Sequence, residues 1–441
     1  MWPHIKTTIP GPRSVAMTQT EAQFLAPGIQ QISTLSGLAI ERGEGAVLQD
    51  VDGNRFLDWV AGIGVASIGH GHPRLAQALG SQAARITCTS FTSAARLSLV
   101  QRIVACAPDP SLNRVQLYSS GAEAVESALR LAKAVTGNSE VISFWGGFHG
   151  KTGGVLGLVG SPWKHGQLPF MPGQSLTPYA ECARCPLRQE PSSCQLFCVD
   201  FLRDQVRFGT GHRVAAILVE PVQGTAGNVV PHPGFLRALK QVADEIGALL
   251  IVDEMITGFG RTGSLWASSW AGVVPDIVVF GKGVAAGFPL SGLLTRADLA
   301  AAKPWSEASH SSSSFGGNPL ACAAADATTQ VIIEENLAEH AAQVGAHLKM
   351  GLVALSKRYP VIAGVRGRGL MLGFDLVENG ELWPKERCVR LFQACLEVGL
   401  LTQTYSPRVR INPPLVLTIP QVDGALMLLS LALDKTYCGG R

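Results

Sequence analysis

A single lysine follows a buried-looking apolar run in the segment PDIVVFGKGVAAGFPLSG, residues 275–292. Residues 277–280 are all apolar, and Lys282 comes next, between Gly281 and Gly283. Lysine is rarely fully buried. Such a lysine could bind phosphate as a point charge, or it could be a desolvated amine with a lowered pKa that forms Schiff bases. A phosphate loop would need a hydroxyl residue after the lysine and a glycine five positions before Gly281, and both are missing.

Polar residues also follow four other apolar runs of the chain. Ligands of parallel α/β sheets bind at the carboxyl ends of the strands, so we expect these residues to share one edge of a sheet. They are Ser120-Gly121-Ala122 after the run 113–118, Phe148-His149 after 140–145, Glu220 after 214–219 and Asp253 after 248–252.

Each of these residue types admits a structural and a chemical interpretation. Ser120-Gly121-Ala122 at the start of a helix is either a plain N-cap or an anion site made by free N–H groups and the helix dipole. Asp253 at the end of a buried strand needs a cationic partner or a donor, as a structural ion pair or in a site. Phe148 is either a core residue or a stacking platform, and His149 either a hydrogen-bonded structural histidine or a ligand.

The combination of these residues favours the chemical interpretation. One cofactor needs a phosphate cradle, an aromatic plate, a carboxylate for a ring nitrogen and a lysine for an aldehyde. That cofactor is pyridoxal 5′-phosphate. The sequence therefore predicts a pyridoxal-phosphate site with Lys282 as its covalent anchor.

The elements that must position these residues alternate between strands and helices. Continuous apolar runs predict strands at 113–118, 140–145, 214–220, 248–254 and 276–282, and helical periods predict helices at 122–135, 234–247, about 320–358 and 384–398. Strands that are apolar on both faces indicate a mostly parallel sheet covered by helices on each side. We expect three segments: an N-terminal arm and small-domain segment (1–69), a large cofactor-binding domain (70–325) and a smaller α+β C-terminal domain (326–441).

Length, composition and charge set the class of protein. The chain has 441 residues, of which 46% are hydrophobic and 16% charged, so it can bury a large core in more than one domain. A net charge of +3 gives no reason to expect nucleic acid or membrane as a partner. The first 17 residues lack an apolar core of signal-peptide length, and no run reaches the ~18 apolar residues of a membrane span. We therefore expect a soluble cytoplasmic protein.

Four of the ten cysteines gather in CARCPLRQEPSSCQLFC, as Cys182, Cys185, Cys194 and Cys198. The pairs have C-x2-C and C-x3-C spacing, in an excursion from the large domain near residues 180–200. Zinc, an iron–sulfur cluster, disulfides and reduced thiols all remain open. We place no metal in the catalytic site itself.

Seven motifs give the chain a resemblance to the class III (ω-amino acid type) aminotransferases, from about residue 35 to 432. They are YSSGAEAVESALRLAK, GGFHGKT, VEPVQGTAG, IVDEMITGFGRTG, DIVVFGKGVAAGFPLSG, SSSSFGGNPLACAAA and VRINPPL. The resemblance implies the fold-type I architecture of pyridoxal-phosphate enzymes, with an α/β large domain and a smaller α+β domain. It also implies a transaminase that moves an amino group from an amine or (ω-)amino acid to a 2-oxo acid, through a Lys282 Schiff base and a pyridoxamine phosphate intermediate.

The resemblance further implies a role for each motif residue. Lys282 would bind the cofactor and move a proton, as general base and then acid, and Asp253 would pair with the pyridine nitrogen. The phosphate would be held by Ser120, Gly121 and Ala122, and the ring stacked by Phe148, beside His149, with Met255 on the other face. Ser314 would reach the phosphate of a neighbouring subunit, which implies a homodimer with shared active sites. Substrate contacts would come from Ile63, Lys151 and Arg410.

Three positions depart from the ornithine and 4-aminobutyrate branches of that family. Thr225 replaces the glutamate that pairs with the carboxylate-binding arginine, so Arg410 is expected to stay available for an α-carboxylate. Lys151 replaces an arginine, which keeps the charge but loses the planar fork. Ile256 replaces a glutamine near the cofactor. A donor with one carboxylate, or a plain amine, therefore fits at least as well as a substrate with two.

Two alternatives to an aminotransferase follow from the same residues. An amino acid racemase or a decarboxylating transaminase would use the same cofactor residues. A catalytically silent binding module of this fold would be expected to lack the lysine or the aspartate, and both Lys282 and Asp253 are present.

Overall fold

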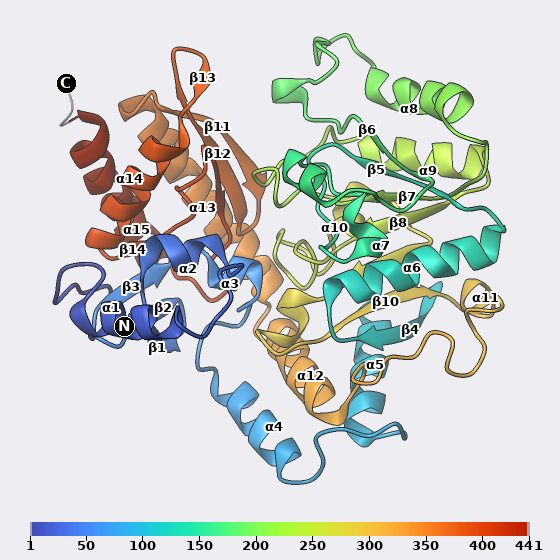
Figure 1. Ribbon diagram of the computed structural model, residues 1–441, viewed down its shortest axis with the longest axis horizontal. Coiled ribbons are helices and arrows are strands. Elements are labelled where there is room, and N and C mark those ends of the chain that lie inside the picture. The colour runs from blue at the N-terminus through green and yellow to red at the C-terminus, as the bar shows by residue number, and fades with distance from the viewer. Residues whose placement is uncertain (1, 439–441) are drawn as a thin grey trace.

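The computed structural model describes residues 2–438 and has two lobes, each built around sheets (Figure 1). The larger lobe contains a seven-stranded sheet in the order β4-β10-β9-β8-β7-β5-β6. All its strands run parallel except β10, which pairs antiparallel with both neighbours. The strands are β4 (Leu112–Tyr118), β5 (Glu140–Phe144), β6 (Gln174–Thr177), β7 (Val214–Val219), β8 (Leu249–Asp253), β9 (Ile277–Phe280) and β10 (Ser291–Arg296).

Helices cover both faces of this sheet, as the continuous apolar runs predict. On one face, α8 (Phe197–Gly209) and α9 (Phe235–Glu245) pack in one cluster with side chains such as Ile217 and Val252. On the other face, α6 (Gly121–Thr136) packs with Leu218 and Ile251. Every residue of β7 is buried, because successive side chains point into opposite helix layers.

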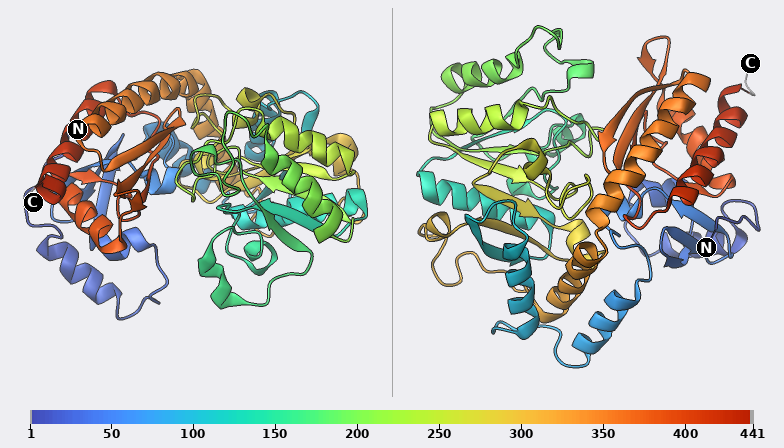
Figure 2. Two further views of the ribbon diagram at one scale, coloured as in Figure 1. Left: turned by 90° about the horizontal axis from the view of Figure 1, so that it is seen from above. Right: turned by 180° about the vertical axis from the view of Figure 1, so that it is seen from behind.

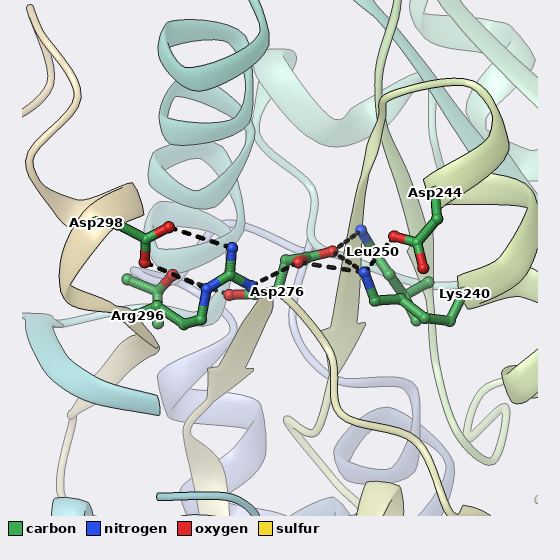
Figure 3. A network of polar contacts seen from close by, with 7 residues as sticks. Lys240, Asp244, Leu250, Asp276, Arg296 and Asp298 are labelled. Carbon is green, nitrogen blue, oxygen red and sulfur yellow. Dashed lines mark hydrogen bonds and ion pairs between the residues drawn. The ribbon is translucent and has the colours of Figure 1, made fainter. Parts of the chain in front are cut away.

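A buried carboxylate fixes the start of the strand that delivers Lys282. Asp276, directly before β9, is 3% exposed. Its oxygens lie 2.8 Å from Arg296 Nη1 and 3.2 Å from Lys240 Nζ, and they accept the Leu250 backbone N–H at 2.9 Å (Figure 3). These bonds join the start of β9 to β8, β10 and α9. They fix the end of β9 that lies opposite Lys282.

The smaller lobe combines the two ends of the chain. A C-terminal sheet pairs β12 (Met371–Glu378) with β11 (Ile362–Arg368), β13 (Glu381–Leu382) and β15 (Arg408–Ile411). The N-terminal strands β1 (Ile40–Glu44), β2 (Val47–Asp50) and β3 (Arg55–Asp58) form a second sheet, which β14 (Leu400–Leu401) joins by pairing parallel with β3.

Helices complete the smaller lobe and connect it to the larger one (Figure 2). α13 (Leu337–Arg358), α14 (Lys385–Glu397) and α15 (Ile419–Leu433) pack beside its sheets. α12 (Pro319–Glu334) contacts α4 (Pro73–Ala83) and α5 (Ala94–Ala105). The shorter helices are α1 (Pro12–Glu21), α2 (Gln31–Ser36), α3 (Ala61–Gly64), α7 (Gly153–Leu156), α10 (Ala267–Ala271) and α11 (Ala297–Ala300). No helix among residues 2–438 is long and apolar enough to cross a membrane.

The structure differs from the sequence-based elements in several places. β6 and β10 were not predicted, because neither contains a long apolar run. The helix predicted over 320–358 is two helices, α12 and α13, which break at Glu335 and Asn336, where Asn336 has a φ of 51°. The predicted boundary after residue 325 therefore lies inside α12.

Candidate active site

The turn between β4 and α6 presents the start of a helix to the sheet edge. Ser120 Oγ accepts the Glu123 N–H at 3.3 Å, as an N-cap does, and Ser291 Oγ donates to Ser120 O at 2.7 Å. Gly121 and Ala122 follow, in the first turn, where backbone N–H groups have no acceptor within the helix. The Ser119 Oγ atom is buried and has no hydrogen-bond partner among the described residues. These donors could together bind an anion.

A histidine connects the ends of β5 and β8. His149 Nδ1 donates to Asp253 Oδ2 at 2.7 Å, and its Nε2 lies 3.0 Å from Ser143 Oγ. Both His149 and Asp253 are almost fully buried, at 4% and 3% exposed. The other oxygen of Asp253 accepts the Met255 N–H at 3.0 Å. Asp253 is therefore a fixed carboxylate at the sheet edge, and His149 is a hydrogen-bonded histidine that orients it.

A second carboxylate, Glu220, closes the end of β7. Its Oε1 accepts the Phe148 N–H at 2.8 Å, and its Oε2 accepts the Gly224 N–H at 2.9 Å. Burial raises the pKa of Glu220, with a further increase from the Asp253 charge, whereas His149 lowers it. One side chain thus clamps the loop that carries Phe148 to the loop that follows β7.

Lys282 follows β9 with its backbone in the left-handed region, at a φ of 45°. Burial lowers the pKa of its ammonium, although the charges of Asp253 and Glu220 act in the opposite direction. A lowered pKa increases the fraction of neutral amine, which is the nucleophilic form. Gly281 leaves room for the Met255 side chain, because a Cβ at this position would force the Met255 sulfur to move.

These strand ends surround a cavity of about 190 Å³. It is lined by Gly121, Ala122, Phe148, His149, Gly150, Glu220, Thr225, Asp253, Met255, Ile256 and Lys282. The residues fit pyridoxal 5′-phosphate chemically: the cavity has an amine, a fixed carboxylate, an aromatic ring and, at the start of α6, an anion site beside the unpaired Ser119 hydroxyl. A side chain at residue 121 would narrow it, since a Cβ there would lie 3.1 Å from the Met255 sulfur.

The predicted substrate and subunit residues lie outside this lining. Lys151 is exposed, and its ammonium lies 5.8 Å from the centroid of the Trp163 ring. Ser314 is exposed, and its carbonyl faces the Cys88 thiol at 3.9 Å.

Ile63 and Arg410 approach the cavity from the smaller lobe. Ile63 has a φ of 69°, within a turn whose Gly64 would place a Cβ 3.9 Å from Ile256. Arg410 is half-buried on β15 and is hydrogen-bonded to the Tyr405 side chain. It is near enough to Lys282 to contribute to lowering the pKa of that amine.

Glu220 and Tyr405 are two of the residues that the sequence predictions left without a role. A signal for Glu220 was available, because it ends an apolar strand as Asp253 does. The sequence carries no such signal for Tyr405, since this residue lies in an irregular segment and only the fold brings it next to Arg410.

Comparison with known proteins gives the family. The profile described as "Aminotransferase class-III" matches residues 30–433. This chain belongs to the class III aminotransferase family. The enzyme is therefore a pyridoxal-phosphate-dependent aminotransferase with a fold-type I architecture, as the motifs predict.

Three known proteins illustrate the range of this family. An alanine/serine racemase of Pyrococcus horikoshii is 35% identical over 99% of this chain and 94% of its own. An acetylornithine aminotransferase of Methanothermobacter thermautotrophicus is 35% identical over 91% of this chain and 95% of its own. The structure of an amine transaminase from an uncultivated Pseudomonas species, in a PLP-bound form, has a TM-score of 0.87 and 30% identity, and covers 94% of this chain and 99% of its own.

Proposed function

We propose that this aminotransferase takes amino acid donors through a single α-carboxylate bound by Arg410, and passes the amino group to a 2-oxo acid. The proposal rests on the absence of a carboxylate partner for Arg410 among residues 2–438. No carboxylate in the described part of the chain forms an ion pair with it, and its hydrogen-bond partner is Tyr405. Thr225, on the cavity wall, cannot compete for the guanidinium as a glutamate would.

The surroundings of Arg410 hold it without neutralising it. Tyr405 is 8% exposed and also accepts a hydrogen bond from Gln403 Nε2 at 3.2 Å. Burial lowers the pKa of Arg410, but a guanidinium remains charged at neutral pH. The Glu220 charge also acts on Arg410, but both Glu220 oxygens accept backbone N–H groups, so a carboxylate that enters the cavity meets a guanidinium that forms no ion pair.

The catalytic roles follow from the chemistry of the cofactor. When bound, pyridoxal phosphate withdraws electrons from the carbon that carries the amino group. Lys282 would anchor it and move the proton at that carbon. Asp253, oriented by His149, would face the ring nitrogen and favour its protonated form. Phe148 would cover the ring, held by Glu220.

We also infer a homodimer with shared sites, in the cytoplasm. Ser314 lies outside its own cavity, in agreement with a contact to a partner subunit. Near it, the exposed aromatic residues Phe91 and Phe315, at 82% and 66% exposed, provide apolar surface for an interface. Mixing Lys282→Ala and Ser314→Ala chains tests this, because only a shared site would regain activity in the mixed dimer.

Racemisation is the second candidate, favoured by the likeness to the alanine/serine racemase. It would use the same cavity but return the proton to the same carbon. Measuring 2-oxo-acid-dependent amine transfer beside loss of optical rotation separates the two. Racemisation without amine transfer would overturn the proposed reaction.

A screen of donors tests the substrate class directly. We expect α-amino acids to react with pyruvate or 2-oxoglutarate and to lose activity in Arg410→Lys, while the visible absorbance of the bound cofactor is retained. Equal activity with simple amines and α-amino acids in both proteins would contradict the role of Arg410. In Lys282→Ala, we expect the visible band that borohydride removes to be lost.

A further inference from the structure

A loop that follows the N-terminal strands reaches the turn that carries Lys282. It comprises residues 59–69, between β3 and α4, and is called the Ser67 loop below. The Ser67 hydroxyl donates to the Gly283 carbonyl at 2.6 Å, and Ser67 is 2% exposed. Gly283 directly follows Lys282, in the 3₁₀ turn Lys282–Ala285. A buried side-chain hydrogen bond therefore ends on the residue next to the proposed cofactor lysine.

The turn of Lys282 needs support from its surroundings. The φ of Lys282, 45°, lies in the left-handed region, which is uncommon for a residue with a side chain. Such a backbone persists only where neighbouring groups fix it. Within residues 2–438, Ser67 is the one side chain that hydrogen-bonds the backbone of residues 282–285. The contact is also close, because a Cβ at Gly283 would lie 3.5 Å from the Ser67 Cβ.

The Ser67 loop is itself held in a defined shape. Residues 61–64 all have positive φ values, of 49°, 62°, 69° and 74°. Asp58 is fully buried, and its Oδ1 accepts the N–H groups of Val60 and Ala61 at 2.7 and 2.9 Å. Its Oδ2 lies 2.8 Å from His70 Nε2. One buried carboxylate thus contacts both ends of the loop.

The Ser67 loop is also bonded to the segment that follows Arg410. The Asn412 N–H donates to Trp59 O at 2.9 Å, and the Leu415 N–H donates to Ser67 O at 2.8 Å. Ser67 therefore contacts the segment after the proposed substrate arginine through its backbone, and the turn of the proposed cofactor lysine through its side chain.

We propose that Ser67 is a positioning residue for Lys282, which fixes the lysine turn against the segment that follows Arg410. The inference rests on the proposed role of Lys282 as cofactor anchor and proton carrier. A group with that role must keep its place to within about 0.5 Å. Without the hydroxyl, the buried Gly283 carbonyl loses its side-chain partner, and the turn is free to relax.

The rate at which Lys282 captures the cofactor tests this role apart from turnover. The full-length apoenzyme is mixed with pyridoxal phosphate, and the appearance of the visible band is followed by stopped-flow absorbance. We expect Ser67→Ala to form the band about five- to tenfold more slowly than the wild type, the effect of one lost hydrogen bond. We expect kcat to fall by a similar factor while KM for the amino donor stays unchanged, because Ser67 does not line the cavity.

Ser311→Ala is a matched control. Ser311 is also buried, and its hydroxyl donates to the Trp305 carbonyl at 2.8 Å, outside the cavity lining. Ser311→Ala should keep the wild-type rate of band formation and the wild-type kcat. Equal slowing in Ser67→Ala and Ser311→Ala would overturn the proposal, since any lost buried hydrogen bond would then have the same effect.

Two further variants separate the possible failures. Lys282→Ala should form no visible band, and a retained band would refute the role of Lys282 itself. Wild-type rates in Ser67→Ala, with no band in Lys282→Ala, would overturn the positioning role alone. If Ser67→Ala does not fold in urea unfolding of the apoenzyme, Asp58→Asn loosens the Ser67 loop from its other end. Slower band formation in Asp58→Asn supports the proposal, and an unchanged rate contradicts it.

Discussion

Replacing Glu220 by glutamine tests whether this buried carboxylate organises the cofactor cavity. Glu254→Gln is a matched control, because Glu254 is also buried and also accepts two backbone N–H groups, from Ala267 at 3.0 Å and Ser268 at 2.7 Å. Glu254 is absent from the cavity lining, whereas Glu220 is part of it.

The structure sets the size of the effect on stability. A carboxamide keeps the shape of the side chain, but its oxygen replaces only one acceptor, and its NH₂ group faces the other backbone N–H. The lost charge-assisted bond is worth about 1.5–3 kcal/mol, and relief from burying a charge offsets part of it. We expect both variants to lose about 1–2 kcal/mol of unfolding free energy near neutral pH.

The effect on the cofactor separates the two variants. Glu220→Gln leaves the Phe148 N–H or the Gly224 N–H without an acceptor, so the Phe148 ring, which we propose covers the cofactor, would lose its fixed position. An aromatic contact is worth about 0.5–1.5 kcal/mol, which corresponds to roughly a two- to twelvefold weaker cofactor affinity. Glu254→Gln should leave that affinity unchanged. Titrating each apoenzyme with pyridoxal phosphate, followed by absorbance, measures the difference.

The pH dependence has a defined sign. Burial raises the pKa of Glu220 above its ordinary value of 4.5, so the added stability of the protonated side chain is full below that value and is lost as pH rises through the folded-state pKa, whereas the contribution of its two backbone hydrogen bonds remains. Glutamine does not titrate. The stability advantage of the wild type over Glu220→Gln should therefore shrink as pH rises from about 5 toward neutrality, in urea unfolding of the apoenzyme. Equal cofactor affinities in the two variants, or an advantage that grows with pH, would refute this account of Glu220.

Three further substitutions test other parts of the structure. Thr225→Glu introduces a carboxylate that competes with the substrate for Arg410. KM for α-amino acid donors should therefore rise about tenfold, the effect of one ion pair, while KM for simple amines stays unchanged. An equal change in KM for both donor classes would contradict the role of Arg410. Lys151→Ala should alter the preference between pyruvate and 2-oxoglutarate and spare cofactor binding, and unchanged kinetics with both acceptors would count against a substrate role. Asp276→Asn leaves Arg296 without its buried partner and should cost about 1–2 kcal/mol in urea unfolding, since the guanidinium is partly exposed. An unchanged urea midpoint would show that the contacts of Asp276 do not stabilise β9.

The sequence by itself determined the mostly parallel character of the large sheet, the cofactor and the family. Apolar runs covered on both faces predict parallel strands, and the residues after them must share an edge. That reasoning placed Gly121, Phe148, Asp253 and Lys282 together, and the structure puts all four on one cavity. Such inferences succeed because the position of a strand and the residue at which it ends are local properties of the chain.

Only the tertiary structure decided how these residues are supported. The Glu220 clamp and the His149–Asp253 contact join different strands, and the Arg410–Tyr405 pair depends on the fold of the smaller lobe. The antiparallel β10 and the pairing of β3 with β14 also escaped prediction, because partner choice between strands depends on contacts distant in sequence. Residue type shows that a carboxylate or an amine is present, whereas packing decides which neighbour it meets and how far its pKa moves.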